Sequence, residues 1–394
     1  MDVQWTDGAS SRDPGQEKSS VRGGIDIPML LITSVLALFG CVMVYSASAV
    51  YAAQYHGDSA YFIVRHLIFL LLAVAFTAVA VRFCTPGFWS DFGVALYAVS
   101  VLLLLAVLVV GSDLGSGAKR WIDFGIFTVQ PSEIAKLALV LVLSRYMAAH
   151  QKQIRSPYKF GGSFRYGVVY PGLMIGALLV PVALEKHISG LMIIGMIGIT
   201  VMFLGGTRVR WIVSILAVIV LAGCLLILIF PYAQARVDTW IHIDRADPLG
   251  SAWQTLQGLM AIGSGGLFGR GLGQSQQKFG YVSQPQNDFI FTIVCEELGF
   301  FGAMLVIGLF LLFVWRGFHI ARHTQDVTSS LIVYGLTFKV ALQVIMNLAV
   351  VTNSMPNTGI SLPFFSYGGT SLMLQIFEIG IILSISRSAT HRKL

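Results

Sequence analysis

Asp288 is the residue whose type and position best suit catalysis. It lies in the segment GYVSQPQNDFIFTIVCEELG, where a long polar, glycine-rich stretch gives way to an apolar run. A carboxylate at the mouth of a membrane helix is costly to desolvate, so it is a functional candidate. The alternative is a helix N-cap, in which the carboxylate accepts hydrogen bonds from free backbone N–H groups. Position alone leaves both interpretations open.

A second set of candidates follows a glycine-rich turn in GSGAKRWIDFGIFTVQPSEIAKLALVL. Lys119 and Arg120 are adjacent cations that suit an anionic head group, and Trp121 after them also fits the aromatic belt at a membrane surface. Glu133 and Lys136 are three residues apart and share one helical face. They either form a mutual ion pair or line a polar cavity, and the sequence does not decide between the two.

Two further loops are rich in glycine or proline. GSGGLFGRGLG matches neither phosphate-loop pattern, but Arg270 and Lys278 lie in and near it, so contact with a polyanion stays open. NSMPNTGISLPFFSYGGTSL is a restricted backbone between apolar runs, which membranes tolerate where it lines a cavity or is buried in protein. The residues expected to shape that cavity are Trp121, Gln130, Pro131, Ser132, Pro363, Ser366, Tyr367, Gly368 and Gly369.

The turn LEKHISG contains Glu185, Lys186 and His187 between two apolar runs. A lone His in such a loop is more often solvated than a ligand, and no second His or Cys stands at metal spacing, so no zinc site is predicted. The four cysteines lie in or beside apolar runs and are expected to be packing residues.

The elements that must position these residues are membrane helices. Of the 394 residues, 56% are hydrophobic and 11% are charged, where a soluble domain carries roughly 25% charged residues. The apolar runs are long and continuous, which excludes the short alternating strands of a membrane barrel. We predict an all-α polytopic membrane protein with ten transmembrane helices at 27–48, 61–81, 93–110, 131–147, 166–183, 189–204, 211–230, 288–314, 330–351 and 368–386.

The distribution of Lys and Arg predicts the orientation. With a cytoplasmic N-terminus, the inside segments carry most of the cations, so both termini are expected in the cytoplasm. We expect residues 1–25 to be a disordered cytoplasmic tail without a signal peptide and 26–387 to be the membrane domain. Within it, 231–287 is expected to be a large extracytoplasmic loop between spans 7 and 8. Residues 388–394 are expected to be a cytoplasmic C-terminal tail. Topology explains the net charge of +7, which therefore does not indicate nucleic-acid binding.

Four strings occur in order along the chain: GAKRWID…QPSEIAKLALVL, QGLMAIGSGGLFGRGLG, QPQNDFIFTIVCEELGFFG and LPFFSYGGTSL. With them the chain closely resembles the SEDS family (shape, elongation, division and sporulation proteins), the FtsW, RodA and SpoVE group, from about residue 26 to 387. The polar N-terminal tail and the form PNTGISLPFFSYGGTSL are more similar to the cell-division FtsW type than to the RodA type. Lys186 departs from the family, which often has proline there, and this puts the shape of that turn in doubt.

The resemblance implies a peptidoglycan glycosyltransferase that polymerises lipid II into β-1,4 glycan strands at the outer face of the cytoplasmic membrane during septal wall synthesis. Asp288 matches the family's catalytic candidate and would act as the general base. No cofactor is certain, although a divalent cation (Mg²⁺ or Mn²⁺) could assist the leaving group. The residues assigned to the pyrophosphate of lipid II are Lys119, Arg120, Lys136, Glu133, Arg270 and Lys278.

The resemblance also implies partners: a class B penicillin-binding protein transpeptidase and other division proteins, at the division septum. The alternatives are a lipid II flippase, a non-catalytic scaffold for the transpeptidase, and a RodA-like elongation polymerase as a different subtype. A flippase needs polar groups along a path that opens to both faces, whereas the restricted polar loops here lie mostly outside. A scaffold needs neither Asp288 nor the intramembrane cations Lys136 and Lys339.

Overall fold

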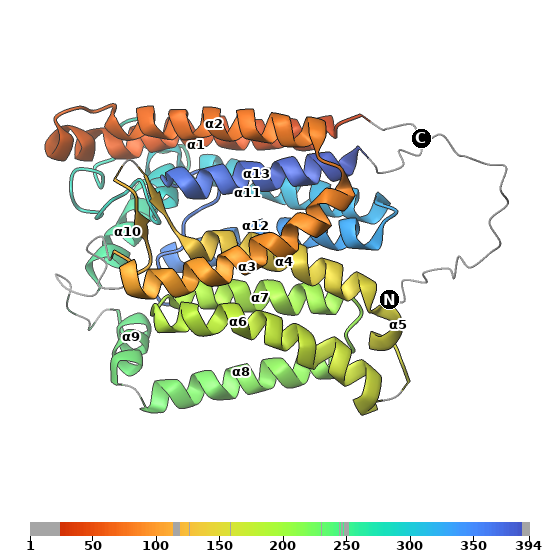
Figure 1. Cartoon of the computed structure of the whole chain (residues 1–394). Helices are drawn as coiled ribbons and strands as arrows, with labels where there is room; N and C mark the ends of the chain where they lie inside the picture. The colour runs from red at the N-terminus through yellow and green to blue at the C-terminus, as the bar shows by residue number, and fades with distance from the viewer. Residues whose placement is uncertain are drawn as a thin grey trace.

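The computed structural model describes residues 24–112, 119–125, 127–157, 159–229, 231–243, 245, 247 and 252–387. Long helices run side by side, with short elements at the two ends of the bundle (Figure 1). The helices are α1 (Ile27–His56), α2 (Tyr61–Phe83), α3 (Pro86–Val110), α4 (Pro131–Ala149), α5 (Gln151–Ile154), the π-helical η1 (Lys159–Val169), α6 (Tyr170–Leu184), α7 (Ile188–Leu204), α8 (Val209–Ile229), α9 (Pro231–Ile241), α10 (Trp253–Ser264), α11 (Ile290–His323), α12 (Val327–Val351) and α13 (Gly369–Ser386).

Each range predicted to span the membrane falls on a helix, namely α1–α4, α6–α8 and α11–α13. Within the described residues, seven segments are long and apolar enough to cross a membrane: α1, α2, α3, Gly162–Leu184, α11, α12 and α13. The apolar helix α7 and the apolar part of α8 are shorter. Several helices continue past their apolar stretch, as α1 does to His56 and α11 to His323.

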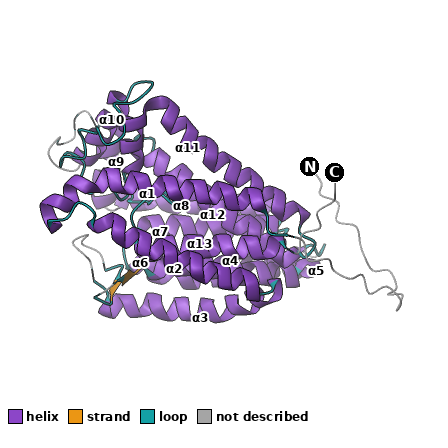
Figure 2. Cartoon of the chain, turned by 90° about the horizontal axis from the view of Figure 1, so that it is seen from above, coloured by secondary structure: helices purple, strands orange, loops and turns teal. Residues whose placement is uncertain are grey.

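The only strands in the described part of the chain form a small hairpin between α3 and α4. β1 (Ile122–Asp123) pairs antiparallel with β2 (Thr128–Val129). Viewed from above, this hairpin, α9 and α10 gather at one end of the bundle and α5 lies at the other (Figure 2). The predicted tails fall outside the described residues except for Gly24 and Ile25.

α12 and α13 lie at the centre of the bundle. In the most apolar window of each, 72% and 67% of the residues are buried, against 22% for α2 and for α3. α4 joins this core, because nearly every residue from Pro131 to Ser144 is buried, and it packs against α3, α7 and α12. A charged side chain facing lipid is energetically costly. The polar residues on these three helices are tolerated because they face the interior of the bundle.

α11 is broken two turns after its start. Gly299 has φ 67° and ψ −163°, and a Cβ there would lie 2.2 Å from the backbone nitrogen of Gly269. The glycine-rich loop after α10 fills the break: Arg270 N–H donates to the Glu296 carbonyl at 3.0 Å, and Phe300 N–H donates to the Gly266 carbonyl at 2.9 Å. Irregular backbone at this depth is stable when protein groups satisfy it. The break therefore anchors the outer loop to α11.

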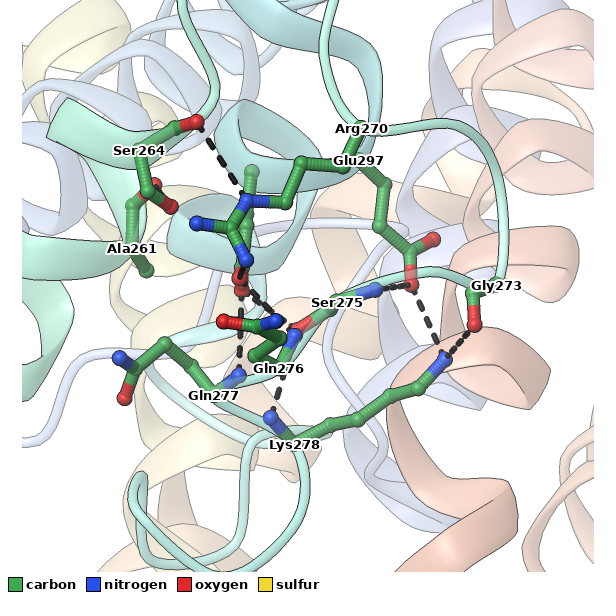
Figure 3. Close-up of polar contacts among 10 residues, drawn as sticks. Ala261, Ser264, Arg270, Gly273, Ser275, Gln276, Gln277, Lys278 and Glu297 are labelled. Carbon is green, nitrogen blue, oxygen red and sulfur yellow. Dashed lines mark hydrogen bonds and ion pairs between the residues drawn. The ribbon is translucent and has the colours of Figure 1, made fainter.

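Two buried carboxylates on α11, Glu296 and Glu297, extend this anchor. Figure 3 shows Glu297 with Lys278 and Ser275 beside it. The Lys278 ammonium donates to Glu297 at 3.1 Å and to the Gly273 carbonyl at 2.7 Å. Gln276 N–H donates to Glu296 at 2.9 Å, and the Arg270 guanidinium lies 3.7 Å from the same carboxylate. From α1, the Ser46 hydroxyl donates to Glu297 at 2.6 Å. Residues 270–278 are thus held over the helix that Asp288 precedes.

Candidate active site

A cavity of about 550 Å³ opens among the polar residues of the core. Its walls come from α2, the segment 119–130, α4, the start of α7, Asn287 and Asp288, α12, the loop 359–368 and α13. Predicted site residues that line it are Asp288, Arg120, Lys136, Glu133, Trp121, Gln130, Ser366, Tyr367, Gly368 and Gly369.

Asp288 does not cap α11. The helix begins at Ile290, its N-cap is Phe289, and no side chain makes a capping hydrogen bond there, so the N-cap interpretation is wrong. The Asp288 carbonyl accepts a hydrogen bond from Asn347 of α12 at 2.7 Å, and the same amide group donates to the Ile360 carbonyl at 2.7 Å. Burial raises the pKa of Asp288 to about 6. A base works best when its pKa lies near the operating pH, and this carboxyl is shifted in that direction.

The last loop is joined to the residues just before Asp288. Tyr367 N–H donates to the Gln286 carbonyl at 2.8 Å, and the Ser366 hydroxyl donates to the Asn287 carbonyl at 2.7 Å. At the start of α13, a Cβ on Gly369 would come within 2.4 Å of the Phe69 ring, so only glycine fits without a shift. The predicted restriction of this backbone thus serves to hold one wall of the cavity.

Glu133 and Lys136 satisfy both interpretations left open by the sequence. The Lys136 ammonium donates to Glu133 at 2.6 Å, both side chains are buried, and both line the cavity. The second carboxylate oxygen of Glu133 has no hydrogen-bond partner in the part of the chain that the structure describes. A second buried ion pair, between Lys339 of α12 and Glu378 of α13, lies one turn along from the cavity residues Gln343 and Gln375.

Several predicted site residues do not line the cavity. Lys119 is exposed, and Pro131, Ser132 and Pro363 are buried beside the cavity. Arg270 and Lys278 lie on the α11 carboxylates shown in Figure 3, which compensate their charge. These ion pairs give the two cations a role in holding the outer loop, and their assignment to pyrophosphate stays a prediction.

The cavity also contains residues that the sequence did not single out, including Arg65, Asp123, Gln343 and His187. His187 was expected in solvent, but it is 7% exposed and the preceding Glu185 is 3% exposed. Burial raises the pKa of Glu185 to about 8. Burial, and then the nearby charges of Arg120 and Lys136, lower the pKa of His187 to about 4. The one sequence signal for this turn was the departure from proline at position 186.

Metal binding finds no support in this geometry. Among the described residues, no three His, Cys, Asp or Glu side chains gather as a group that could hold a metal ion. We therefore derive no chemical step through Mg²⁺ or Mn²⁺.

Comparison with known proteins places this architecture in a family. The family model described as "Cell cycle protein", for FtsW, RodA and SpoVE, matches residues 27–391. The chain is 39% identical over 371 residues to stage V sporulation protein E of Bacillus subtilis. The aligned region covers 93% of this chain and 98% of that protein. It is 36% identical over 362 residues to the probable peptidoglycan glycosyltransferase FtsW of Trichlorobacter lovleyi, covering 92% and 93%.

Solved structures have the same fold as this chain. A chain from a peptidoglycan synthase complex, described in terms of the structural coordination of polymerization and crosslinking, superimposes with a TM-score of 0.75 at 25% identity, covering 92% of this chain and 98% of that one. The rod shape determining protein RodA of Thermus thermophilus gives a TM-score of 0.68 at 25% identity, covering 93% and 98%. The chain therefore belongs to the FtsW, RodA and SpoVE family of cell cycle proteins.

Proposed function

We propose that this protein is a peptidoglycan glycosyltransferase that polymerises lipid II, with Asp288 as its general base. One observation carries the proposal: a single cavity brings together a carboxylate whose pKa is about 6 and the cations Arg120 and Lys136. The names of its relatives support the same activity.

The reaction follows from these charges. The acceptor 4-hydroxyl oxygen forms a bond to the anomeric carbon of the donor strand, and the bond from that carbon to pyrophosphate breaks. Asp288 takes the hydroxyl proton, a transfer that typically contributes ~10²–10⁴-fold. The electron pair leaves with undecaprenyl pyrophosphate, whose charge Arg120 and Lys136 offset through preorganised contacts. The aromatic and glycine residues of the last loop shape the space for the sugars.

Ten membrane spans, two cytoplasmic termini and an outward-facing cavity complete the proposal. Helices occupy all ten predicted ranges, and the cations are concentrated in the segments predicted to be inside. The cavity is lined by segments from the end of the bundle that also carries β1, β2 and α10 (Figure 1). This placement suits a lipid-linked substrate reached from the outer leaflet of the cytoplasmic membrane.

A flippase is less well supported by the packing around the cavity. About two turns along α12 from Gln343, a Cβ on Gly335 would lie 2.7 Å from Val140 of α4 and 3.2 Å from Val201 of α7. Helices α4, α7 and α12 are therefore in close contact at Gly335. Between Gly335 and Gln343 on α12 lies Lys339, which is paired with Glu378 of α13. A polar path through the bundle would have to separate these helices.

The implied partner is a class B penicillin-binding protein, because a related chain was solved within a synthase complex whose description includes crosslinking. The FtsW type, acting with other division proteins at the septum, is the subtype that we propose. Purified protein, with and without this partner, should convert lipid II into glycan strands resolved by gel electrophoresis. Absence of strands under both conditions, with folded protein, would contradict the proposed function.

A further inference from the structure

The turn between α6 and α7 has a shape that a proline could not adopt. Lys186 has φ 55°, whereas a proline ring holds φ near −65°. In this conformation the Lys186 carbonyl accepts a hydrogen bond from the Arg120 guanidinium at 2.9 Å. The turn thus joins the segment 119–130 to the start of α7. It fixes Arg120, a cavity residue, directly beside the next residue in the turn, His187.

His187 is seated in the cavity wall by a matching glycine. A Cβ on Gly190 would lie 2.6 Å from Nδ1 and 2.7 Å from Cε1 of the imidazole, so the ring packs directly on the backbone of α7. Among the described residues, the buried Nδ1 has no hydrogen-bond partner. Because Nδ1 lies against the backbone of α7, the ring nitrogen left for a ligand in the cavity is Nε2. Because no partner fixes the tautomer, the neutral ring can present an N–H group to an acceptor.

The surroundings of His187 favour an anion. Ser189 and Gly190 line the cavity in the first turn of a 17-residue helix, where backbone N–H groups lack intrahelical acceptors and the helix dipole is positive. Arg120 from the outer segment, Lys136 from α4 and the carboxylate of Glu133 lie near the same imidazole. The Glu185 carboxyl lies near Arg120, but burial raises its pKa to about 8, so it is largely neutral at pH 7. The Lys136 charge is shared with Glu133, so the start of α7 contributes much of the positive field beside the imidazole.

We propose that His187 and the first turn of α7 form the subsite that binds the diphosphate group of the polyprenyl-linked donor. The inference rests on the proposed function and deepens it, because it separates two parts of the cavity. Asp288 lies against the last loop and α12, where it meets the acceptor hydroxyl. The diphosphate is drawn to α4 and α7, away from the carboxylate that would repel it. His187 donates a hydrogen bond to a phosphate oxygen and is a substrate-binding residue.

The test uses the purified full-length chain in lipid nanodiscs and two ligands, undecaprenyl pyrophosphate and undecaprenol. Thermal protection by each ligand isolates the contribution of the diphosphate. The wild-type protein should bind undecaprenyl pyrophosphate more tightly than undecaprenol. His187→Phe keeps a ring on Gly190 but removes both nitrogens, so it should weaken binding of undecaprenyl pyrophosphate by about tenfold, the effect of one hydrogen bond to a charged group. Binding of undecaprenol should not change.

His187→Gln, which restores a donor, should recover part of the loss, and His242→Phe, a histidine of the outer region that does not line the cavity, serves as the matched control. Gly190→Ala should reproduce the His187→Phe effect because it displaces the ring. The inference is overturned if the wild type does not distinguish the two ligands, or if His187→Phe binds both as the wild type does. Lipid II polymerisation, assayed separately, decides the proposed function, so the two failures are distinguishable.

Discussion

Asp288 and Arg120 carry opposite charges in the cavity, and different hydrogen bonds hold each of them in place. Asp288 is held through its carbonyl by Asn347, and Arg120 is held through its guanidinium by the Lys186 carbonyl. Each anchor is a contact with backbone: the Asp288 carbonyl in one case and the Lys186 carbonyl in the other. The two adjacent cations, Lys119 and Arg120, have different surroundings: only Arg120 lines the cavity, while Lys119 is exposed.

This difference gives a matched pair of substitutions. Arg120→Ala removes a charge-assisted contact worth roughly 1.5–3 kcal/mol and should slow lipid II polymerisation by about 10- to 150-fold. Lys119→Ala should lower the rate far less, because its ammonium is outside the cavity. Initial rates of glycan synthesis on proteins of equal yield and thermal stability make the comparison. Equal losses in the two variants would contradict the placement of the cationic site.

The pH dependence of the reaction should report Asp288. A base with a pKa of about 6 is protonated and inactive at lower pH, so kcat/KM should fall as the pH drops through about 6. Rates of lipid II polymerisation measured between about pH 4.5 and pH 8 would show this limb. A limb near the ordinary Asp pKa of about 3.9 would mean that the carboxyl is not desolvated as the structure places it.

Among the elements, α11 contributes most to positioning the site. Its first two turns lie between Asp288 and the break at Gly299, and the glycine-rich loop and residues 270–278 hold these turns from outside. The sequence indicated Arg270 and Lys278 as polyanion contacts because their carboxylate partners, Glu296 and Glu297, are about 20 residues away and sit in an apolar run. Burial of those two carboxylates is a property of the packed bundle, and local pattern does not reveal it.

Two glycines of α11 test this role. Gly299→Ala places a Cβ at 2.2 Å from the Gly269 nitrogen in a left-handed conformation, so it should lower the melting temperature and reduce polymerisation together. Gly308→Ala, with no atom within 4 Å of the added Cβ, should be neutral or slightly stabilising. Thermal unfolding in detergent and glycan synthesis are the measurements. A Gly299→Ala protein as stable as Gly308→Ala would show that the break does not need glycine.

Over the whole molecule, the sequence predicted the helices well because hydrophobic length is a local property. The position of Asp288 just before a helix was also predictable, since it marks a boundary between a polar loop and an apolar run. The burial of His187 was not, because it depends on a left-handed Lys186 and on Gly190 three residues later. Contacts between distant segments, such as Lys278 with Glu297, likewise require the fold.

The proposed topology predicts which face each loop occupies. In a background without Cys41, Cys84, Cys224 and Cys295, single cysteines at Ser112 and Asn357 should react with an impermeant reagent from outside. Cysteines at Arg155 and Arg322 should react only after the membrane is permeabilised. If Ser112 and Asn357 labelled from opposite faces, the two segments could not build one cavity.

The most direct test of the account is the order of activities of two Asp288 variants. Asp288→Asn keeps the size of the side chain but removes its basicity, so polymerisation of lipid II should collapse. Asp288→Glu keeps a carboxylate displaced by ~1 Å and should retain partial activity, with losses up to about 10²-fold. Because burial raises the pKa of Asp288, ionisation destabilises the folded state as the pH rises through about 6, and Asp288→Asn should be at least as stable as the parent above that pH. A folded Asp288→Asn protein that elongates lipid II at close to the wild-type rate would contradict the assignment of Asp288 as the base.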